Sequence, residues 1–459
     1  MTQPTVESMA PWQSRIALCC YGMLMRLLIP AMLLRMVWRG RAEALYRHLI
    51  GERLGYYTPD IAARIEPGRL WLHAVSLGET RAAAALLQAL RERCPGLRLL
   101  LTHGTATGRD AGRALLRPGD LQLWMPWDSP GAVERFLVRH QPCVGVLMET
   151  EVWPSMLHAA GQHGVPIVLA NARLSAKSLD SQRVWPSLMR PAMQGFGTVL
   201  AQTADDERRL RDAGAGNIVV CGNLKFDMTP DPKQLEQGRI WRGELGRPVV
   251  MAASTREGEE APLLAAWQAG NRSVTATHTT RRPLLLLVPR HPQRFDEVAA
   301  LCEAAGVTLA RRSAWAVGQR PPGAAADADV WLGDSLGELP LYYALADVAL
   351  LGGSFAPLGG QNLIEAAACG CPLLIGPSSF NFAEAAELSV AAGAALRVAD
   401  LPAAVESALG LLDRETERRS RAERAQAFAA AHRGAAAKMA AAIVALIPEP
   451  WVADEGLSD

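Results

Sequence analysis

Two pairs of glycines in residues 352–371, GGSFAPLGGQNLIEAAACGC, mark the stretch whose residue types most suggest chemistry. An apolar run at 348–351, typical of a buried strand, precedes it, and an Ala-rich segment typical of a helix follows the glycines. Glycines let the backbone approach a ligand closely, and the free N–H groups of a first helical turn bind anions. The stretch therefore predicts an anion site. The glycine pairs are Gly352 with Gly353 and Gly359 with Gly360.

Two polar side chains begin the helix expected after these glycines, Asn362 and Glu365. A carboxylate repels phosphate, so Glu365 is better suited to hold the hydroxyls of a sugar. A loop that offers N–H groups to phosphate and a carboxylate to a ribose indicates a nucleotide or nucleotide-sugar site. The alternative is a structural strand-loop-helix turn whose glycines serve only tight packing, since such loops are common in α/β folds.

A candidate general base lies in residues 71–80, WLHAVSLGET. Ser76 and Gly78 belong to the turn after an expected strand, and Glu79 stands at the start of the following helix. A carboxylate in a first helical turn is favoured by the helix macrodipole, so a purely structural charge is one interpretation. The other is a general base, which needs to reach an attacking hydroxyl and to have a pKa not far below the working pH.

Further charged residues follow other expected strands of the first half. Glu149 and Glu151, in METEVWP, end the expected strand 144–148, and alternation puts both on one side if the strand continues. Arg173, in NARLSAKS, and Lys225, in GNLKFD, follow two later strands. A metal site is weakly supported, because no D-x-D or H-x-H neighbour joins the carboxylates. Together these loops gather polar groups on the carboxyl side of one sheet.

The second half repeats this pattern of polar loops after strands. Ser254 and Thr255, in ASTREGEE, could cap a helix while donating to phosphate. Arg290 and His291, in VPRHPQRF, follow the next strand, and the fixed donor fork of arginine suits a phosphate or a carboxylate. A further turn opens a helix whose N-terminus could meet a base or phosphate. That turn consists of Gly337, Glu338 and Leu339.

Strand-like runs alternate with helical patterns along most of the chain, which predicts parallel sheets covered by helices on both faces. Ligands of such sheets bind outside the carboxyl ends of the strands, so two consecutive Rossmann-like halves would form a cleft. The polar segment TPDPKQLEQGRIWRGELG is interpreted as the connection between them. The expected strands are 70–74, 97–101, 121–125, 144–148, 167–170, 199–202 and 218–220, then 249–252, 284–288, 307–310, 330–332, 348–351 and 373–375. The expected regions are a first domain at 42–228, a linker at 229–247, a second domain at 248–400, and one or two helices with a tail at 401–459.

The N-terminal residues 16–38, IALCCYGMLMRLLIPAMLLRMVW, are apolar and long enough to span a bilayer. They contain Arg26 and Arg35, each of which costs roughly 2.5–3.5 kcal/mol at a bilayer centre on insertion scales, with Pro30 between them. Arginines at an interface instead reach the anionic headgroups. Residues 1–41 are therefore interpreted as a membrane-interface anchor, with a single tilted span and an ordinary soluble helix as alternatives.

Length, net charge and cysteine content limit the classes of protein to which the chain can belong. A chain of 459 residues is expected to form two or three domains. Its net charge of +1 gives no overall attraction to nucleic acid. The eight cysteines form no C-x-x-C pair, which indicates reduced, mostly buried thiols in a cytosolic compartment.

Taken together, the motifs resemble the Kdo transferases, which transfer 3-deoxy-D-manno-octulosonic acid (Kdo) from CMP-Kdo to a lipid A precursor in lipopolysaccharide synthesis. The resemblance runs in order from about residue 70 to 385, and the family's basic, apolar N-terminal anchor is similar to residues 15–41. Each motif alone is weak, whereas the combination is specific. The matching segments are WLHAVSLGET, MPWDSP, METEVWP, NARLSAKS, GNLKFD, ASTREGEE, VPRHPQRF, GDSLGELPLYYALAD and GGSFAPLGGQNLIEAA.

The resemblance implies a GT-B fold, with two Rossmann-like domains facing a central cleft and an N-terminal membrane-anchoring helix. Glu79 falls on the family's catalytic carboxylate and would act as the general base of an inverting transfer, with no metal and no cofactor. CMP-Kdo would bind mainly in the second half, and the lipid A precursor (lipid IVA) would approach the first half near the anchor. The protein would lie at the cell inner membrane, with its catalytic domains on the cytoplasmic side, and would bind no nucleic acid. The CMP-Kdo residues would be Ser254, Thr255, Arg290, His291, Gly337, Glu338, Leu339, Gly359, Gly360, Asn362 and Glu365, and the acceptor or supporting residues Ser76, Gly78, Glu149, Glu151, Arg173 and Lys225.

One position departs from the family pattern. The family usually has G-G-H-N in the glycine-rich loop, whereas this chain has Gln361. Glutamine still donates and accepts hydrogen bonds but carries no positive charge.

Two alternatives to Kdo transfer stay open. One is another GT-B enzyme that uses a UDP-sugar, such as a hexosaminyltransferase or an epimerase. The other is an inert membrane-bound scaffold, against which Glu79 and the set of polar loops argue.

Overall fold

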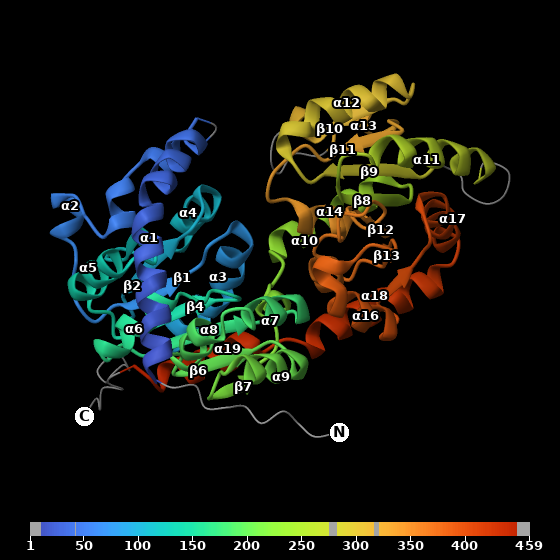
Figure 1. Cartoon of the computed structure of the whole chain (residues 1–459). Coiled ribbons are helices and arrows are strands. Elements are labelled where there is room, and N and C mark those ends of the chain that lie inside the picture. Colours follow the sequence, from blue (N-terminus) through green and yellow to red (C-terminus); the bar gives the residue numbers. More distant parts are fainter. Residues whose placement is uncertain (1–10, 42, 275–281, 316–320, 448–459) are drawn as a thin grey trace, which may run out of the picture. The chain divides into compact units, whose positions relative to one another are not determined.

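The computed structural model describes residues 11–41, 43–274, 282–315 and 321–447, which Figure 1 colours along the sequence. The chain divides into two compact units. The first contains the residues up to Asp227 and those from Arg433 onward, and the second contains Met228–His432. Each unit is built on one parallel sheet of seven strands, so the predicted α/β class with two Rossmann-like units is confirmed.

The sheet of the first unit has the strand order β3-β2-β1-β4-β5-β6-β7. The order reverses between β1 and β4, and in open α/β sheets ligands bind at this reversal, outside the carboxyl ends of the strands. Its strands are β1 (Leu70–His73), β2 (Leu99–His103), β3 (Leu121–Trp124), β4 (Val144–Met148), β5 (Ile167–Ala172), β6 (Thr198–Ala201) and β7 (Ile218–Val220). Its helices are α1 (Pro11–Arg39), α2 (Pro59–Ala62), α3 (Leu77–Arg93), α4 (Ala106–Gly112), α5 (Pro130–His140), α6 (Pro154–Gln162), α7 (Ala176–Gln182), α8 (Pro186–Gln194), α9 (Ala204–Ala213) and α19 (Ala435–Val444), with short 3-10 turns η1 (Ala44–Arg47), η2 (Ile50–Leu54), η3 (Arg113–Leu115) and η4 (Leu224–Asp227).

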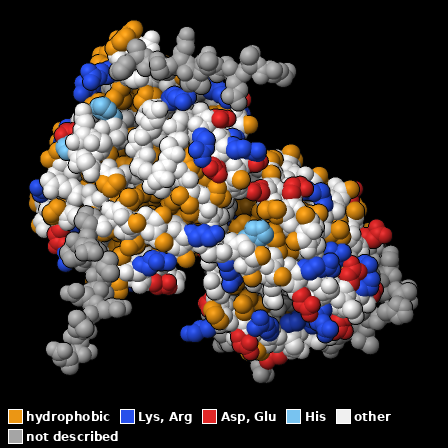
Figure 2. Space-filling model, turned by 90° about the horizontal axis from the view of Figure 1, so that it is seen from below, with side chains coloured by type: hydrophobic (Ala, Val, Ile, Leu, Met, Phe, Trp, Pro, Cys, Tyr) orange, Lys and Arg blue, Asp and Glu red, His pale blue; other side chains and the backbone are white. Residues whose placement is uncertain are grey.

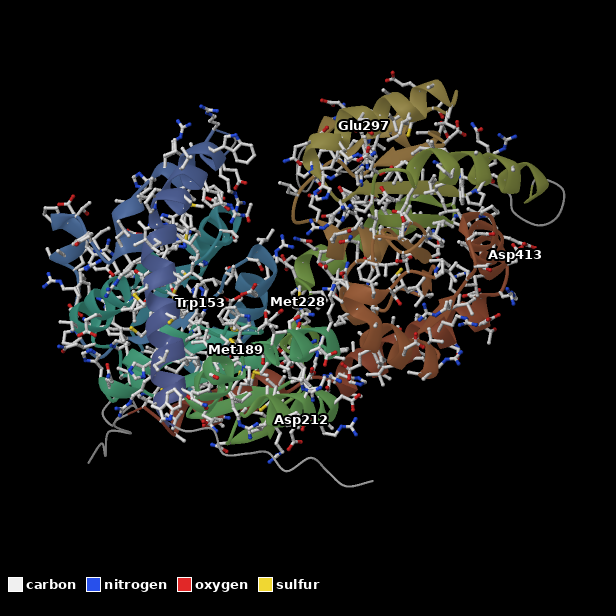
Figure 3. The ribbon with its side chains drawn as sticks, viewed as in Figure 1. Trp153, Met189, Asp212, Met228, Glu297 and Asp413 are labelled. Atoms are coloured by element: carbon white, nitrogen blue, oxygen red, sulfur yellow. The ribbon has the colours of Figure 1, made fainter. Side chains whose placement is uncertain are left out.

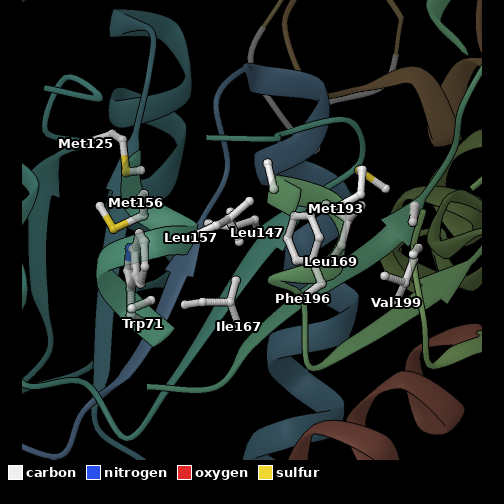
Figure 4. Close-up of a cluster of buried hydrophobic side chains, with 14 of the residues drawn as sticks. Trp71, Met125, Leu147, Met156, Leu157, Ile167, Leu169, Met193, Phe196 and Val199 are labelled. Atoms are coloured by element: carbon white, nitrogen blue, oxygen red, sulfur yellow. The ribbon is translucent and has the colours of Figure 1, made fainter. Parts of the chain in front are cut away.

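Apolar side chains cover both faces of this sheet, which explains why its strands are short continuous apolar runs rather than alternating ones. On one face Trp71, Leu147 and Phe196 belong to a buried cluster completed by residues of α5, α6 and α8, part of which is drawn in Figure 4. On the other face, buried residues of α3 pack with Met439 and Ile443 of α19. The last helix of the chain is thus part of the first core.

Among the described residues, helix α1 packs on α6, α8 and η1 of the first unit and leaves several large apolar side chains exposed. The Tyr21 side chain hydrogen-bonds the buried Asp128, and Gly22 lies so close to Pro130 that an added Cβ would be 2.8 Å from its ring. Near the other end of the helix, the Arg39 guanidinium lies 4.3 Å from the centroid of the Tyr46 ring. The stretch Trp12–Arg39 is long and apolar enough to cross a membrane, with a mean hydropathy of 1.9 in its most apolar window.

The second unit has the strand order β10-β11-β9-β8-β12-β13-β14, which reverses between β8 and β12. Its strands are β8 (Val249–Thr255), β9 (Leu284–Pro289), β10 (Leu309–Arg311), β11 (Val330–Leu332), β12 (Val348–Leu351), β13 (Leu373–Ile375) and β14 (Ala395–Arg397). Its helices are α10 (Pro232–Leu245), α11 (Glu260–Val274), α12 (Phe295–Ala304), α13 (Gly323–Ala326), α14 (Leu339–Leu345), α15 (Leu363–Ala368), α16 (Ala383–Ala391), α17 (Leu401–Leu412) and α18 (Glu415–Ala431), with 3-10 turns η5 (Pro292–Arg294), η6 (Arg312–Ala314) and η7 (Phe380–Phe382).

Two expectations about organisation were wrong, and one strand was missed. The segment 229–247 is not a bare linker, because most of it forms α10, which buries Trp241 and Leu245 and packs against α14 of the second unit. The C-terminal segment is not a separate region of one or two helices: α17 and α18 belong to the second unit, whereas α19 belongs to the first. Strand β14 was not predicted, because Ala395–Arg397 continue the Ala-rich sequence of α16 rather than forming a separate apolar run. The ends of the predicted anchor and tail, 1–10 and 448–459, lie outside the described residues.

Candidate active site

Glu79 lies in the first turn of α3, and the turn before the helix holds its carboxylate. The Val75 N–H donates to Oε2 at 2.8 Å, and the Ser76 hydroxyl donates to Oε1 at 2.8 Å. Ser76 Oγ in return accepts the Glu79 N–H at 3.3 Å, which makes a capping box that fixes the start of the helix. The structural role considered for this carboxylate is therefore present in the fold, and it holds the two oxygens in one orientation.

Burial raises the pKa of the Glu79 carboxyl above its ordinary value, while the hydrogen bonds from Val75 and Ser76 act in the opposite direction. The nearby charge of Glu149 raises this pKa further. A carboxylate that is partly desolvated yet held by hydrogen bonds is a stronger proton acceptor than a free surface glutamate. These are properties that a general base needs.

Glu149 connects two of the predicted cations. Its Oε2 atom lies 3.1 Å from Nε of Arg173, and its Oε1 atom lies 3.9 Å from Nζ of Lys225. The strand β4 ends at Met148, and Glu149 adopts a left-handed backbone with φ of 59°, so strand alternation does not continue to Glu151. Left-handed backbone is strained for a residue with a Cβ, and such strain gathers at functional sites.

Glu151 is the second carboxyl group near Glu79. Burial, followed by the charges of Glu79 and Glu149, raises the pKa of Glu151 to about 7. Burial also lowers the pKa of Lys225, although the charge of Glu149 opposes this shift. The first unit thus gathers carboxyl groups and cations beyond the carboxyl ends of β1, β4, β5 and β7.

Asn171 was not among the predicted site residues, although it supports them. It has a left-handed backbone with φ of 52°, and its Oδ1 atom accepts the Leu224 N–H at 3.0 Å. Its carbonyl oxygen also accepts a hydrogen bond from Gln202 Nε2 at 2.9 Å. Asn171 therefore fixes the loop that carries Lys225. Asn171 lies near the end of β5, where the pairing with β6 is irregular, and asparagine tolerates left-handed backbone, so this residue type could have identified the position.

In the second unit, the loops after β8 and β9 lie together. Ser254 has a left-handed backbone with φ of 57°, and the buried Thr255 has an Oγ1 atom with no hydrogen-bond partner among the described residues. The Arg290 N–H donates to the Thr255 carbonyl at 2.9 Å, and Arg290 Nε donates to Gln361 Oε1 at 3.2 Å. The Gln361 side chain is thus held by a predicted donor-site arginine. The His291 side chain is largely exposed, and the loss of some of its hydration, together with the positive charges of neighbouring arginines, lowers its pKa.

The glycine-rich loop after β12 differs from the simple anion site that its sequence predicted. The N–H groups of Gly353, Phe355 and Ala356 donate to the carboxylate of Glu259, at 2.7, 3.1 and 3.3 Å. The N–H of Gly360 donates to the carbonyl of Gly353 at 2.7 Å. These N–H groups therefore already have acceptors within the protein.

Other predicted donor-site residues begin helices. Asn362 caps α15 by accepting the Ile364 N–H at 3.1 Å, and the half-buried Glu365 lies in the first turn of that helix. Gly359, in the loop before α15, donates its N–H to Ser378 Oγ at 3.0 Å. At the start of α14, Glu338 accepts a hydrogen bond from Arg312 at 2.7 Å, so this carboxylate has an internal partner. In the same turn, Gly337 has a left-handed backbone with φ of 80°, and Leu339 begins α14. In the first unit, Gly78 lies in the first turn of α3.

The structure thus places the predicted residues in two groups, one in each unit. The first group contains Ser76, Gly78, Glu79, Glu149, Glu151, Arg173 and Lys225, and the second contains the residues predicted to bind the donor. In Figure 3, Trp153, which lies just after Glu151, is labelled on the first unit, and Met228 is labelled where the second unit begins. On the face shown in Figure 2, acidic and basic side chains are interspersed rather than gathered by sign.

Comparisons with known proteins first bear on the fold. A glycosyltransferase of Rickettsia africae superposes with a TM-score of 0.54 over 83% of this chain and 98% of that one, at 12% sequence identity. This likeness concerns the fold, and the two units have the GT-B-type architecture of glycosyltransferases.

Sequence similarity then identifies the family within the glycosyltransferases. A family model described as 3-deoxy-D-manno-octulosonic-acid transferase matches residues 48–228. A 3-deoxy-D-manno-octulosonic acid transferase of Bordetella pertussis is 53% identical over 80% of this chain and 84% of its own length. One from Haemophilus influenzae is 32% identical over 82% of this chain and 86% of its own length. The chain belongs to the Kdo transferase family of glycosyltransferases.

Proposed function

We propose that the protein transfers Kdo from CMP-Kdo to a lipid A precursor with inversion of the anomeric configuration. The family membership supports the sugar and the reaction type. The observation that carries the mechanism is the partly desolvated, hydrogen-bonded carboxylate of Glu79 at the start of α3. In the proposed step, Glu79 takes the proton of a glucosamine hydroxyl of the acceptor. The freed oxygen forms a bond to the anomeric carbon of Kdo, and the bond from that carbon to the phosphate oxygen breaks, so CMP leaves with the electron pair.

In this proposal the remaining residues bind and orient the substrates. Ser254, Thr255 and Arg290 bind the phosphate and carboxylate groups of CMP-Kdo, since together they offer hydroxyl and guanidinium donors around adjoining loops. Asn362 and Glu365 hold sugar hydroxyls at the start of α15. Arg173, which is half exposed, and Lys225 offer positive charge on the acceptor side.

The protein is further proposed to lie on the cytoplasmic face of the inner membrane, with α1 in the interface. The helix is held to the first unit at Tyr21 and again at Arg39, which are about 27 Å apart at 1.5 Å per residue. A helix attached along one flank to a polar unit over this length is not surrounded by lipid, which favours an interfacial helix over a span. Its opposite side is apolar and exposed, for example at Leu27 and Leu34.

The direct test is transfer from CMP-Kdo, generated in situ, to a tetraacyl lipid A precursor, with products resolved by mass. Wild-type protein is expected to add Kdo. Glu79→Gln is expected to lose about 10²-fold or more in kcat while remaining folded, because it removes the proton acceptor. Glu92→Gln, on the exposed C-terminal part of α3, is the matched control and should keep full activity.

Two results would contradict the proposal. No product from folded wild-type protein would exclude CMP-Kdo as the donor and favour a UDP-sugar. An unchanged rate in Glu79→Gln would exclude Glu79 as the base.

A further inference from the structure

Glu259 is a buried carboxylate that occupies the centre of the glycine-rich loop after β12. It directly precedes α11 and is only 2% exposed. Its Oε2 atom accepts the N–H groups of Gly353 at 2.7 Å and Arg256 at 2.9 Å. Its Oε1 atom accepts those of Phe355 at 3.1 Å and Ala356 at 3.3 Å. Convergent backbone N–H groups of this kind form a nest that binds an anion, and here the anion is a side chain of the protein itself.

The contacts of Glu259 join two loops that lie far apart in the sequence. Arg256 belongs to the loop after β8, whereas Gly353, Phe355 and Ala356 belong to the loop after β12. The end of β8 and the loop after β12 also approach closely at Gly352, where an added Cβ would lie 2.4 Å from the Ser254 carbonyl oxygen. A side chain at position 352 would therefore push the loops apart.

The second glycine pair depends on the same arrangement. The carbonyl of Gly353, whose N–H is bound by Glu259, accepts the N–H of Gly360 at 2.7 Å. Gly360 leads directly into Gln361 and the helix cap Asn362. Glu259 therefore helps to hold the end of β8 with its loop, the loop after β12 and the start of α15. These segments carry most of the residues assigned above to the donor.

We propose that Glu259 is a positioning residue for donor binding. It acts as an internal anion that holds the glycine-rich loop in its binding conformation before the donor arrives. The phosphate of the donor then binds outside this nest, because the N–H groups of the nest are already occupied. When the loop is already ordered, donor binding does not carry the free-energy cost of ordering it, so the affinity for the donor is higher. The identity of the donor rests on the proposed function, whereas the role of Glu259 in the loop does not.

The kinetic test compares Glu259→Gln and Glu259→Ala with wild type in the Kdo transfer assay. The expected result is a rise of about tenfold or more in the KM for CMP-Kdo, since charged hydrogen bonds to the loop are lost. The KM for the lipid acceptor is expected to stay within about twofold, because that substrate is assigned to the other unit. Glu257→Gln removes an exposed carboxylate two residues away and should behave as wild type.

Chemical rescue separates positioning from general damage to the fold. Added formate or acetate is expected to restore the donor KM of Glu259→Ala in part, because a small carboxylate fits the vacated nest. Chloride at the same ionic strength should not do so, and neither should acetate added to Glu257→Gln. An unchanged donor KM in both Glu259 variants, or a fall in kcat alone, would overturn the proposal.

Hydrogen exchange of the ligand-free protein tests the loop without any assumption about the donor. Amides of residues 353–360 are expected to exchange faster in Glu259→Gln than in wild type and in Glu257→Gln, while those of β12 stay protected. Unchanged exchange would overturn the role of Glu259 even if Kdo transfer is confirmed. Faster exchange in a protein that transfers no Kdo would leave this role standing and refute only the proposed function.

Discussion

Ser76 and Glu79 bind each other reciprocally, the Ser76 hydroxyl donating to the Glu79 carboxylate and the Glu79 N–H donating to Ser76 Oγ. The same pair that begins α3 therefore also fixes the carboxylate assigned to proton removal. This coupling means that a change in the cap should alter both the stability of the protein and the titration of Glu79.

Ser76→Ala is expected to lower the free energy of unfolding by about 1 kcal/mol, the usual cost of losing a helix cap. It should also raise the pKa of Glu79, because a hydrogen bond to the charged form is lost. The acidic limb of the kcat/KM profile should then move to higher pH. Urea denaturation and a pH–rate profile measure the two effects. Ser76→Thr, which keeps a hydroxyl, should restore the wild-type profile.

Glu151→Gln is expected to leave the acidic limb in place. The charge of Glu79 raises the pKa of Glu151, whereas the carboxylate that raises the pKa of Glu79 is Glu149. The folding stability of the variant should also fall less than that of wild type as the pH rises. The folded-state pKa of Glu151, about 7, is above its unfolded value, so its favourable contribution is complete below the unfolded pKa. That contribution is lost as pH rises toward 7. Equal slopes of stability against pH in both proteins would refute this assignment.

Asn171→Ala and Asn171→Gly form a matched pair that isolates backbone strain. Both lose the hydrogen bond to the Leu224 N–H, but only glycine adopts a φ of 52° without steric cost. The alanine variant should therefore be less stable than the glycine variant by about 1 kcal/mol. Thermal and urea unfolding measure this difference. Equal stability would show that position 171 is not strained.

Leu27→Ser combined with Leu34→Ser is expected to weaken sedimentation with anionic lipid vesicles by tenfold or more. These two side chains are 78% and 72% exposed on α1, and burying a leucine contributes about 1.5–3 kcal/mol. The unfolding free energy should stay unchanged, because neither residue is buried against the first unit. Tyr21→Phe is the complementary control, since it should lower stability while leaving the exposed apolar face intact. Full sedimentation of the double variant would exclude this face as the membrane contact.

Much of the fold could be predicted because its strands are local apolar runs. The bounds of β4, β7, β11, β12 and β13 are those predicted. The capping role of Glu79 could also be anticipated, because Ser76 and Glu79 are only three residues apart.

What could not be predicted depends on contacts between distant residues. Glu259 binds N–H groups more than 90 residues further along the chain, and no local pattern reveals this. Helix α10 was mistaken for a linker because its polar composition hides the few residues, such as Trp241, that pack on the second unit. The left-handed backbone of Glu149 likewise arises from the way its loop is held, not from its residue type.

The placement of α19 has a consequence for the order in which the protein can fold during synthesis. The carboxylate of Asp227 accepts the N–H groups of Gly434 and Ala436, and α19 supplies Met439 and Ile443 to the core under α3. The first unit is therefore discontinuous in sequence, whereas the second is continuous. On the ribosome, the second unit can fold while the first still lacks one of its helices. The half of the protein that is translated first is thus the one that is completed last.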